Sequence, residues 1–368
     1  MSAMDKFEHG GKLYAAAWRE GGTVQELLDF SVNINPFGLP ESVRQAVKEA
    51  LEHIVNYPDA TATLLKAALA KRYSLERDMF SVGNGAAELM YVLCHRMRPK
   101  RVLIPAPTFS EYERAARSSG AAIKYVSLNA IDGFALNTGE IINQLSQVDL
   151  VFLCNPNNPT GRIEEREKLA AIIAAAHKSD TYVVIDESFI DFVTDNDLFT
   201  CKPLVAKYPK LIILQSMTKT YAIPGLRLGF AIADNAIIQL LDSGKDPWNV
   251  NSLAQAAGVA ALDDAEYLKR SVEAVTLARQ TMIAELRRVP GFTPYPGAAN
   301  YLLVNIAGSG FNAPRLGQAL WKYNIIIRDC SNYPGLSPDY IRLAVKLASQ
   351  NGMLVATLLK LCKDGAGF

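Results

Sequence analysis

Residues 215–229 have the sequence QSMTKTYAIPGLRLG and follow an apolar run at 211–214 that predicts a short buried strand. A proline–glycine pair interrupts this segment, which places Lys219 on a loop just beyond the strand end. Open α/β sheets bind ligands outside the carboxyl ends of their strands. The lysine amine suits Schiff-base formation with a pyridoxal aldehyde, and Ser216 and Arg227 suit binding of its phosphate. Taken alone, the pattern is more often that of a surface lysine without a role, so the other motifs decide.

The composition is that of an ordinary soluble globular protein, with 368 residues, 49% hydrophobic and 20% charged, and a net charge of +1. This balance gives no electrostatic reason to expect nucleic acid or an anionic membrane as a partner. We find no apolar run that could span a bilayer and no signal peptide. The five cysteines are scattered, without a CxxC pair or a Cys/His cluster. We therefore expect reduced thiols, no metal site and a cytoplasmic location.

Strand and helix patterns alternate along the first two thirds of the chain, which is typical of a mostly parallel sheet covered on both faces. A long helical region, 253–288, then leads to a smaller α+β unit. We expect an α/β fold with an N-terminal arm (1–40), a large domain (41–247) and a small C-terminal domain (248–368) that includes the linking helix.

The N-terminal arm has polar residues at every second position, Ser31, Asn33 and Asn35, which predicts a half-buried extended segment with one polar edge. Such an arm needs a surface to lie on, and an active-site cleft is one candidate. Asn33 and Asn35 fit equally well as turn residues ahead of a proline. His9 lies in a His-Gly-Gly loop, where a histidine is more often structural than functional. A short helical patch is expected at 13–18.

Further clusters of small, aromatic or polar residues follow predicted strands. Their members are Gly85, Ala86, Ala87, Phe109, Asn158 and Asp186. The turn at 85–87 opens a helix, where a phosphate can reach free backbone N–H groups, although many such turns are only tight turns. Phe109 could stack on a flat ring or belong to the core. Because all the clusters follow strand ends, they can converge on one crevice.

The ordered set of motifs resembles the fold type I pyridoxal-phosphate enzymes of the aminotransferase class I/II superfamily. The set consists of Asn-Pro-Thr-Gly at 158–161, Asp186, and Ser216-x-x-Lys219 followed by Arg227. Each motif is moderately specific, but their order at successive strand ends is strongly so. The resemblance covers essentially the whole chain and implies the fold type I architecture.

The resemblance implies a role for each residue near the cofactor ring. Lys219 would hold pyridoxal 5'-phosphate and later move protons. Asp186 would keep the pyridine nitrogen protonated, so that the ring accepts the electrons released at the substrate Cα. Asn158 would donate to the ring hydroxyl, and Phe109 would stack on the ring face.

The cofactor phosphate would be bound, by the same resemblance, by Gly85, Ala86, Ala87, Ser216 and Arg227. Tyr57 would reach this phosphate from the other subunit of a homodimer. Arg342 would bind an anionic group of the substrate, its carboxylate. One position departs from the family: many members have a tyrosine that bonds the ring hydroxyl where this chain has Phe189, which removes one donor.

Within the superfamily, the chain most resembles the L-threonine-O-3-phosphate decarboxylases of cobalamin biosynthesis. The shared features are His-Gly-Gly at 9–11, the arm at 29–36, and the segments at 106–112, 186–192 and 247–251. This resemblance implies that L-threonine O-3-phosphate loses carbon dioxide to give (R)-1-amino-2-propanol O-2-phosphate. Its phosphate would be bound by His9, Asn33 and Arg328, with Arg342 nearby, and which arginine binds which anion stays open.

Three alternatives stay open. O-phosphoserine lacks only a methyl group, which a pocket discriminates by about 1–3 kcal/mol. Histidinol-phosphate aminotransferases share the cofactor motifs, and residues alone do not fix which Cα bond lies out of the ring plane. A non-catalytic scaffold that kept the fold is a third possibility, against which the intact Lys219, Asp186 and Arg227 argue.

Overall fold

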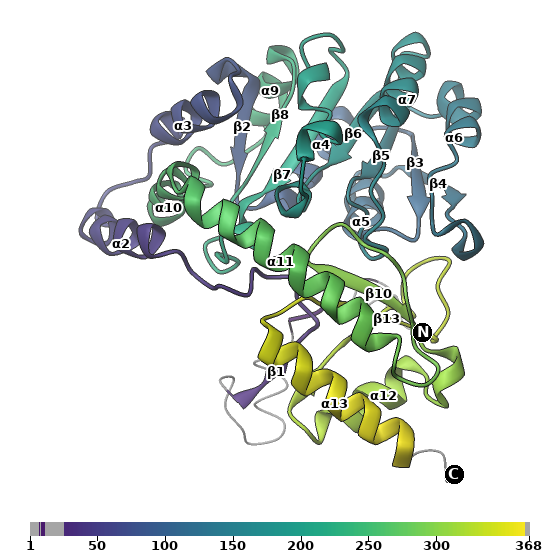
Figure 1. Cartoon of the computed structure of the whole chain (residues 1–368). Coiled ribbons are helices and arrows are strands. Elements are labelled where there is room, and N and C mark those ends of the chain that lie inside the picture. Colours follow the sequence, from purple (N-terminus) through teal and green to yellow (C-terminus); the bar gives the residue numbers. More distant parts are fainter. Residues whose placement is uncertain (1–6, 8, 12–25, 365–368) are drawn as a thin grey trace.

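The computed structural model describes residue 7, residues 9–11 and residues 26–364. Its largest element is a seven-stranded sheet with the order β2-β8-β7-β6-β5-β3-β4 (Figure 1). The strands are β2 (Phe80–Gly83), β3 (Arg101–Ala106), β4 (Ala122–Ser127), β5 (Leu150–Cys154), β6 (Tyr182–Asp186), β7 (Leu211–Ser216) and β8 (Gly229–Ile232). β8 is antiparallel to both of its neighbours, β2 and β7, and the other strand pairs of this sheet are parallel. The predicted α/β fold with a mostly parallel sheet is confirmed.

Helices cover both faces of this sheet, and alternate residues of one strand enter different cores. In β6, Val183 and Ile185 pack in the core that α3 and α7 share, whereas Val184 packs in the core of α4, α5 and α9. The helices of this part are α2 (Glu41–Ala50), α3 (Thr63–Tyr73), α4 (Ala86–Met97), α5 (Glu111–Ser118), α6 (Thr138–Gln144), α7 (Arg166–Lys178), α8 (Met217–Thr220), α9 (Asn235–Asp242) and α10 (Ser252–Asp263). Within the described ranges, no helix is long and apolar enough to cross a bilayer.

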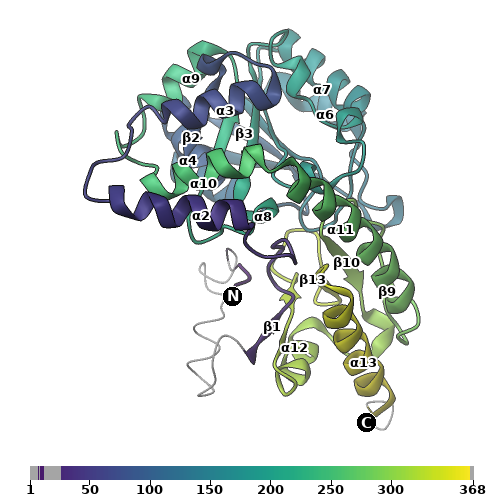
Figure 2. The same ribbon diagram turned by 60° about the vertical axis from the view of Figure 1, so that its left-hand side comes forward.

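The smaller part is reached through the long helix α11 (Ala265–Leu286), which runs from the large sheet to the second sheet (Figure 2). The Asp264 side chain accepts a hydrogen bond from the Tyr267 amide and so caps α11, and the helical region expected at 253–288 is divided here into α10 and α11. The antiparallel sheet has the order β12-β13-β10-β9. The strands of this sheet are β9 (Thr293–Pro294), β10 (Tyr301–Asn305), β12 (Arg328–Asp329) and β13 (Tyr340–Ala344). The helices of the smaller part are α12 (Ala313–Trp321) and α13 (Ala348–Asp364).

Helix α10 lies in the core of the large sheet, although the predicted division of the chain gave it to the smaller unit. Its residues Ala254, Ala257 and Ala261 belong to the same buried cluster as residues of β6, β7 and β8, and the helix packs on α2 and α3. The boundary between the domains stays a prediction.

The N-terminal arm lies along the smaller part of the molecule. β1 (Leu28–Asp29) pairs in parallel with β11 (Ile325–Ile326), and the Ala344 amide donates to the Phe30 carbonyl. From there the chain runs with Ser31, Asn33 and Asn35 buried, while Val32 and Ile34 between them are only half-buried. The polar edge of the predicted extended segment therefore faces the protein interior. The helical patch expected at 13–18 lies outside the described residues.

Asn35 connects the arm to the segment that carries Lys219. Its amide N–H donates to the Lys219 carbonyl at 3.0 Å. Its side-chain Nδ2 donates to the Thr220 carbonyl and to the Ser271 Oγ of α11, both at 2.8 Å. Its Oδ1 also accepts from the Phe37 amide at 3.1 Å, so Asn35 forms the expected turn at the proline and in addition joins three segments.

The prediction that Lys219 lies on a loop is wrong, because residues Met217–Thr220 form a single helical turn, α8. Pro224 and Gly225 break the backbone only after this turn is complete. The Tyr221 amide still donates to the Met217 carbonyl. The turn brings Lys219 back over Ser216, which a loop would not require.

We expect Asn35→Ala to lower the free energy of unfolding by about 1–3 kcal/mol, because it leaves the buried Thr220 carbonyl without this donor. Urea unfolding measures this change. Asn235→Ala is the matched control, since its side chain donates to Asp78 at an exposed position, and we expect a loss of no more than about 0.5 kcal/mol. Equal losses in both variants would contradict the structural role of Asn35.

Candidate active site

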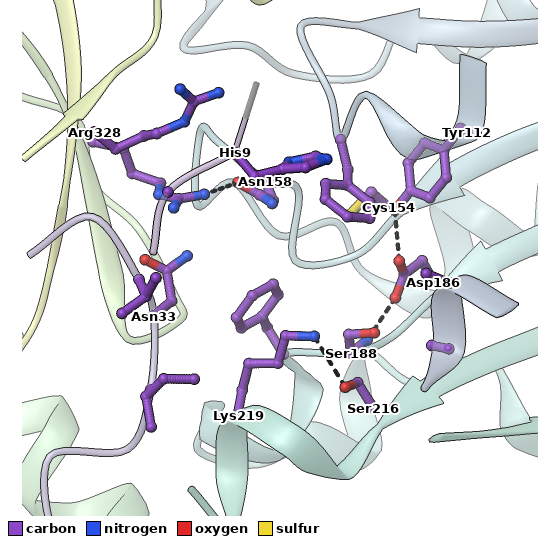
Figure 3. A pocket seen from close by; sticks show the side chains of 18 of the residues that line it. His9, Asn33, Tyr112, Cys154, Asn158, Asp186, Ser188, Ser216, Lys219 and Arg328 are labelled. Atoms are coloured by element: carbon purple, nitrogen blue, oxygen red, sulfur yellow. Dashed lines mark hydrogen bonds between the residues drawn. The ribbon is translucent and has the colours of Figure 1, made fainter. Parts of the chain in front are cut away.

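A cavity of about 300 Å³ lies where the carboxyl ends of β5, β6 and β7 meet the arm and the smaller sheet. Of the residues singled out in the sequence, all except Gly85 and Tyr57 line this cavity. They are His9, Asn33, Ala86, Ala87, Phe109, Asn158, Asp186, Ser216, Lys219, Arg227, Arg328 and Arg342. Figure 3 shows His9, Asn33 and Arg328 on one side of the opening and Asp186, Ser188 and Tyr112 on the other.

Asp186 ends β6 as a buried carboxylate with two donors. The Tyr112 hydroxyl donates to Oδ2 at 2.7 Å, and the Ser188 amide donates to Oδ1 at 2.9 Å (Figure 3). Burial, and then the neighbouring Asp186 charge, raises the pKa of Tyr112 well above its ordinary value. Tyr112 therefore stays a protonated donor. Each carboxylate oxygen keeps a free lone pair for a further donor from the cavity.

Lys219 projects from α8 toward Asp186 and donates from Nζ to the Ser216 Oγ at 3.0 Å. Burial lowers the pKa of Lys219 to about 8, against the opposing effect of Asp186 and with a smaller contribution from Arg227. A neutral amine is a nucleophile and a base, and this shift makes it available near physiological pH. The Phe189 ring lies 5.9 Å from Nζ, with no hydroxyl to contact it.

Asn158 has its amide orientation set by Arg342. The Arg342 Nη1 donates to the Asn158 Oδ1 at 2.5 Å, and Nη2 donates to the Ser31 carbonyl of the arm at 2.7 Å. A guanidinium only donates, so the oxygen of the Asn158 amide faces Arg342 and its NH₂ group is left for other partners. The Arg342 Nε is buried without a hydrogen-bond partner among the described residues.

The arm side of the cavity carries the positive charge. Arg328 is buried, donates to the Asn332 Oδ1 at 2.9 Å, and lies 5.3 Å from the centre of the Tyr333 ring. The Oδ1 of Asn33 is buried without a partner in the part of the chain that the structure describes. Arg328, Arg342 and His9 form a wall suited to anionic ligands. An anion cannot pair with the Asn33 Oδ1, so Asn33 would contribute through its NH₂ group.

The start of α4 forms a second place for an anion. No side chain caps this helix end within the described ranges, so its first N–H groups are available. Gly85 precedes it with a φ of +88°, and a Cβ atom here would lie 2.6 Å from the Arg227 Nη2. Glycine at this position therefore lets the guanidinium approach the helix start.

Gly85 and Tyr57 are the two predicted residues that do not line the cavity. Gly85 contacts it indirectly through Arg227. The Tyr57 side chain is 77% exposed and stacks on Trp248, with ring centres 4.3 Å apart. Among the residues that the structure describes, nothing brings Tyr57 to the cavity, so its role stays a prediction about a second subunit.

The sequence interpretation gave no role to Tyr112 or Cys154, which both line the cavity. Tyr112 follows Phe109 by three residues at the start of α5, and this helical spacing was a usable indication that both face the same side. Cys154 is paired with Asp186 in the register of β5 and β6. Burial raises the pKa of the Cys154 thiol to about 12, so it stays neutral and is not a nucleophile.

We expect Lys219 in cofactor-free protein to become reactive toward acetic anhydride as pH rises through about 8, because the neutral fraction increases above its lowered pKa. Competitive labelling followed by peptide mass spectrometry measures this profile. Lys71, whose side chain is 83% exposed, gives the reference in the same digest. Parallel profiles for the two lysines would contradict the effect of burial.

Comparisons with known proteins agree with this geometry. A family model described as aminotransferase class I and II matches residues 25–358. The threonine-phosphate decarboxylase of Salmonella typhimurium is 38% identical over 352 residues, which cover 95% of each chain.

Two solved structures have the same fold. The L-threonine-O-3-phosphate decarboxylase from Porphyromonas gingivalis has a TM-score of 0.81 and 28% identity, covering 91% of this chain and 99% of that one. The histidinol-phosphate aminotransferase from Clostridium acetobutylicum has a TM-score of 0.86 and 29% identity, covering 92% and 100%. From its motifs, its architecture and these matches, the chain belongs to the aminotransferase class I and II family.

Proposed function

We propose that the protein is a pyridoxal-phosphate-dependent decarboxylase that converts L-threonine O-3-phosphate to (R)-1-amino-2-propanol O-2-phosphate, for cobalamin biosynthesis in the cytoplasm. The observation that carries the proposal is the convergence of His9, Arg328 and Arg342 on the cavity that contains Lys219. A substrate with both a carboxylate and a phosphate needs two sets of cations, whereas a simple amino acid needs one. The relative from Salmonella typhimurium, which bears the decarboxylase name, supports the same substrate.

The donor set of the cavity fits the cofactor. Its phosphate is assigned to the turn at 85–87, Ser216 and Arg227, because the uncapped start of α4 and the guanidinium lie together. Its ring is assigned to Asp186, Asn158 and Phe109. When bound, pyridoxal phosphate supplies an electron sink for the bond that breaks at the substrate Cα.

The residues of the chain divide the remaining work. Asp186, held by Tyr112 and Ser188, would accept a hydrogen bond from the pyridine nitrogen and keep its proton in place. The NH₂ group of Asn158 would donate to the ring hydroxyl oxygen, and Phe189 would add no second donor. Lys219, with its lowered pKa, carries the proton that Cα receives after carbon dioxide has left.

The substrate anions are assigned to the arm side of the cavity. Arg342 takes the carboxylate, and His9, Asn33 and Arg328 take the phosphate. Burial of Arg328 and Arg342 strengthens both interactions, since few water molecules compete there.

We also propose a homodimer in which Tyr57 reaches the cofactor phosphate of the other subunit. Support comes from the exposed apolar side chains around it: Ile54 is 59% exposed, Val55 85% and Tyr57 77%. A mass in solution near twice the 40.2 kDa of the chain agrees with this proposal, and a stable monomer with full activity contradicts it.

The reaction is tested by product analysis with O-phospho-L-threonine, in the presence and absence of 2-oxoglutarate. Carbon dioxide and aminopropanol phosphate, formed without the keto acid, are the expected products. Glutamate formed from histidinol phosphate and 2-oxoglutarate, without carbon dioxide from phosphothreonine, would instead identify an aminotransferase. That second candidate has the support of the Clostridium acetobutylicum fold match.

Arg328→Ala should lower kcat/KM for O-phosphothreonine by roughly 10- to 100-fold, because a charged hydrogen bond contributes about 1.5–3 kcal/mol. Unphosphorylated threonine should lose much less. The exposed Arg315 of α12 provides the control, Arg315→Ala, which should leave both substrates unchanged. Equal losses on the two substrates in Arg328→Ala would refute its assignment to the phosphate.

A further inference from the structure

His9 is held by a buried carboxylate that no part of the proposed reaction uses. Its Nε2 lies 2.6 Å from the Oε1 of Glu111, whose side chain is only 9% exposed. The other oxygen of Glu111 accepts from the Tyr91 hydroxyl at 2.8 Å, and the Arg114 guanidinium lies 3.5 Å from Oε1. Burial acts to raise the pKa of Glu111, but the His9 and Tyr91 hydrogen bonds keep it below its ordinary value. Glu111 is therefore a charged acceptor.

The backbone beside His9 is fixed as well. The Gly11 amide donates to the Ser31 Oγ at 3.0 Å. A Cβ on Gly10 would lie 2.4 Å from the Ser31 carbonyl oxygen, so only glycine fits this contact. That same oxygen accepts from Arg342. The His-Gly-Gly segment is thus seated on the part of the arm that borders the anion-binding wall.

The carboxylate also decides which ring nitrogen of His9 faces the ligand. An ionised carboxylate only accepts, so Nε2 carries the hydrogen of this contact. His9 lines the cavity, with its ring 5.6 Å from the ring of Phe109. In the imidazolium form of His9 both ring nitrogens carry hydrogen, so with Nε2 bound to Glu111 the Nδ1–H is the donor that remains for a phosphate oxygen.

We infer that Glu111 is a positioning residue for substrate binding: it binds Nε2 of His9 and so presents Nδ1 to the phosphate of the substrate. The inference rests on the proposed function, in which His9 contacts that phosphate. Glu111 itself touches neither substrate nor cofactor. Its effect appears in affinity for phosphorylated ligands and only secondarily in turnover.

The test compares Glu111→Gln with Tyr91→Phe in the holoenzyme. Glutamine keeps the shape and one acceptor oxygen, but its neutral amide no longer fixes Nε2 as the donor. We expect KM for O-phosphothreonine to rise roughly tenfold, with kcat changed much less, because charge-assisted hydrogen bonds are about twice as strong as neutral ones. Tyr91→Phe removes the other donor to Glu111 and leaves the His9 contact, so its KM should change less than about threefold. An unchanged KM in Glu111→Gln would overturn the inference.

A double-mutant cycle separates positioning from a purely structural effect. An asparagine at position 9 places its amide near the site of Nδ1 but is too short to reach Glu111. In His9→Asn protein, the added Glu111→Gln change should therefore raise KM no further. If it still raised KM tenfold, Glu111 would act by a route other than His9, and the inference would fail.

Calorimetric binding of inorganic phosphate to the same holoproteins distinguishes this inference from the proposed function. If Glu111→Gln bound phosphate more weakly and the unmutated protein released no carbon dioxide, the positioning of His9 by Glu111 would be supported and the decarboxylase would be rejected. If the unmutated protein released carbon dioxide, and Glu111→Gln changed neither KM nor phosphate affinity, the decarboxylase would be supported and the positioning role would be rejected. If the unmutated protein neither bound phosphate nor released carbon dioxide, both would be rejected.

Discussion

The buried guanidinium of Arg342 is the contact on which the arrangement of the cavity depends. It extends from β13 of the smaller sheet and donates both to Asn158, in the loop after β5, and to Ser31 of the arm. Burying a cation is costly unless acceptors offset the loss of water, and Nη1 and Nη2 find theirs on two other segments, so removing either acceptor would leave the buried charge less well paired. The polar edge of the arm also faces inward, where the Ser31 and Asn35 side chains form hydrogen bonds with other segments. Residues from three distant parts of the chain are thereby brought together at the cavity that contains Lys219.

Much of this site was predictable because its residues follow strands of a parallel sheet. Asn158, Asp186 and Ser216 each come at or just after the carboxyl end of a strand, and a parallel sheet brings such ends to one edge. The alternation of strands and helices also predicted the sheet itself. Local sequence was sufficient here, because in a parallel sheet residues that follow successive strands are neighbours in space.

The remaining contacts were not predictable, because they join residues that no local pattern relates. Arg342 and Ser31 are 311 positions apart, Tyr112 and Asp186 are 74 apart, and His9 and Glu111 are 102 apart. The turn at Lys219 was missed for a different reason: a proline–glycine pair marks where a helix cannot continue, but not that one turn can form before it. In the arm, the alternation of polar and apolar residues located the polar edge, but it did not indicate whether the polar or the apolar side chains are buried.

Architecture alone does not choose between removing the carboxylate and removing the hydrogen at the substrate Cα, since a decarboxylase and an aminotransferase match this fold with TM-scores of 0.81 and 0.86. The most direct measurement uses O-phospho-L-threonine that carries deuterium at Cα, in ordinary water. Our account predicts an aminopropanol phosphate that retains this deuterium and gains one solvent hydrogen in place of the carboxylate. Loss of the deuterium to solvent, with the carboxylate retained, would contradict it.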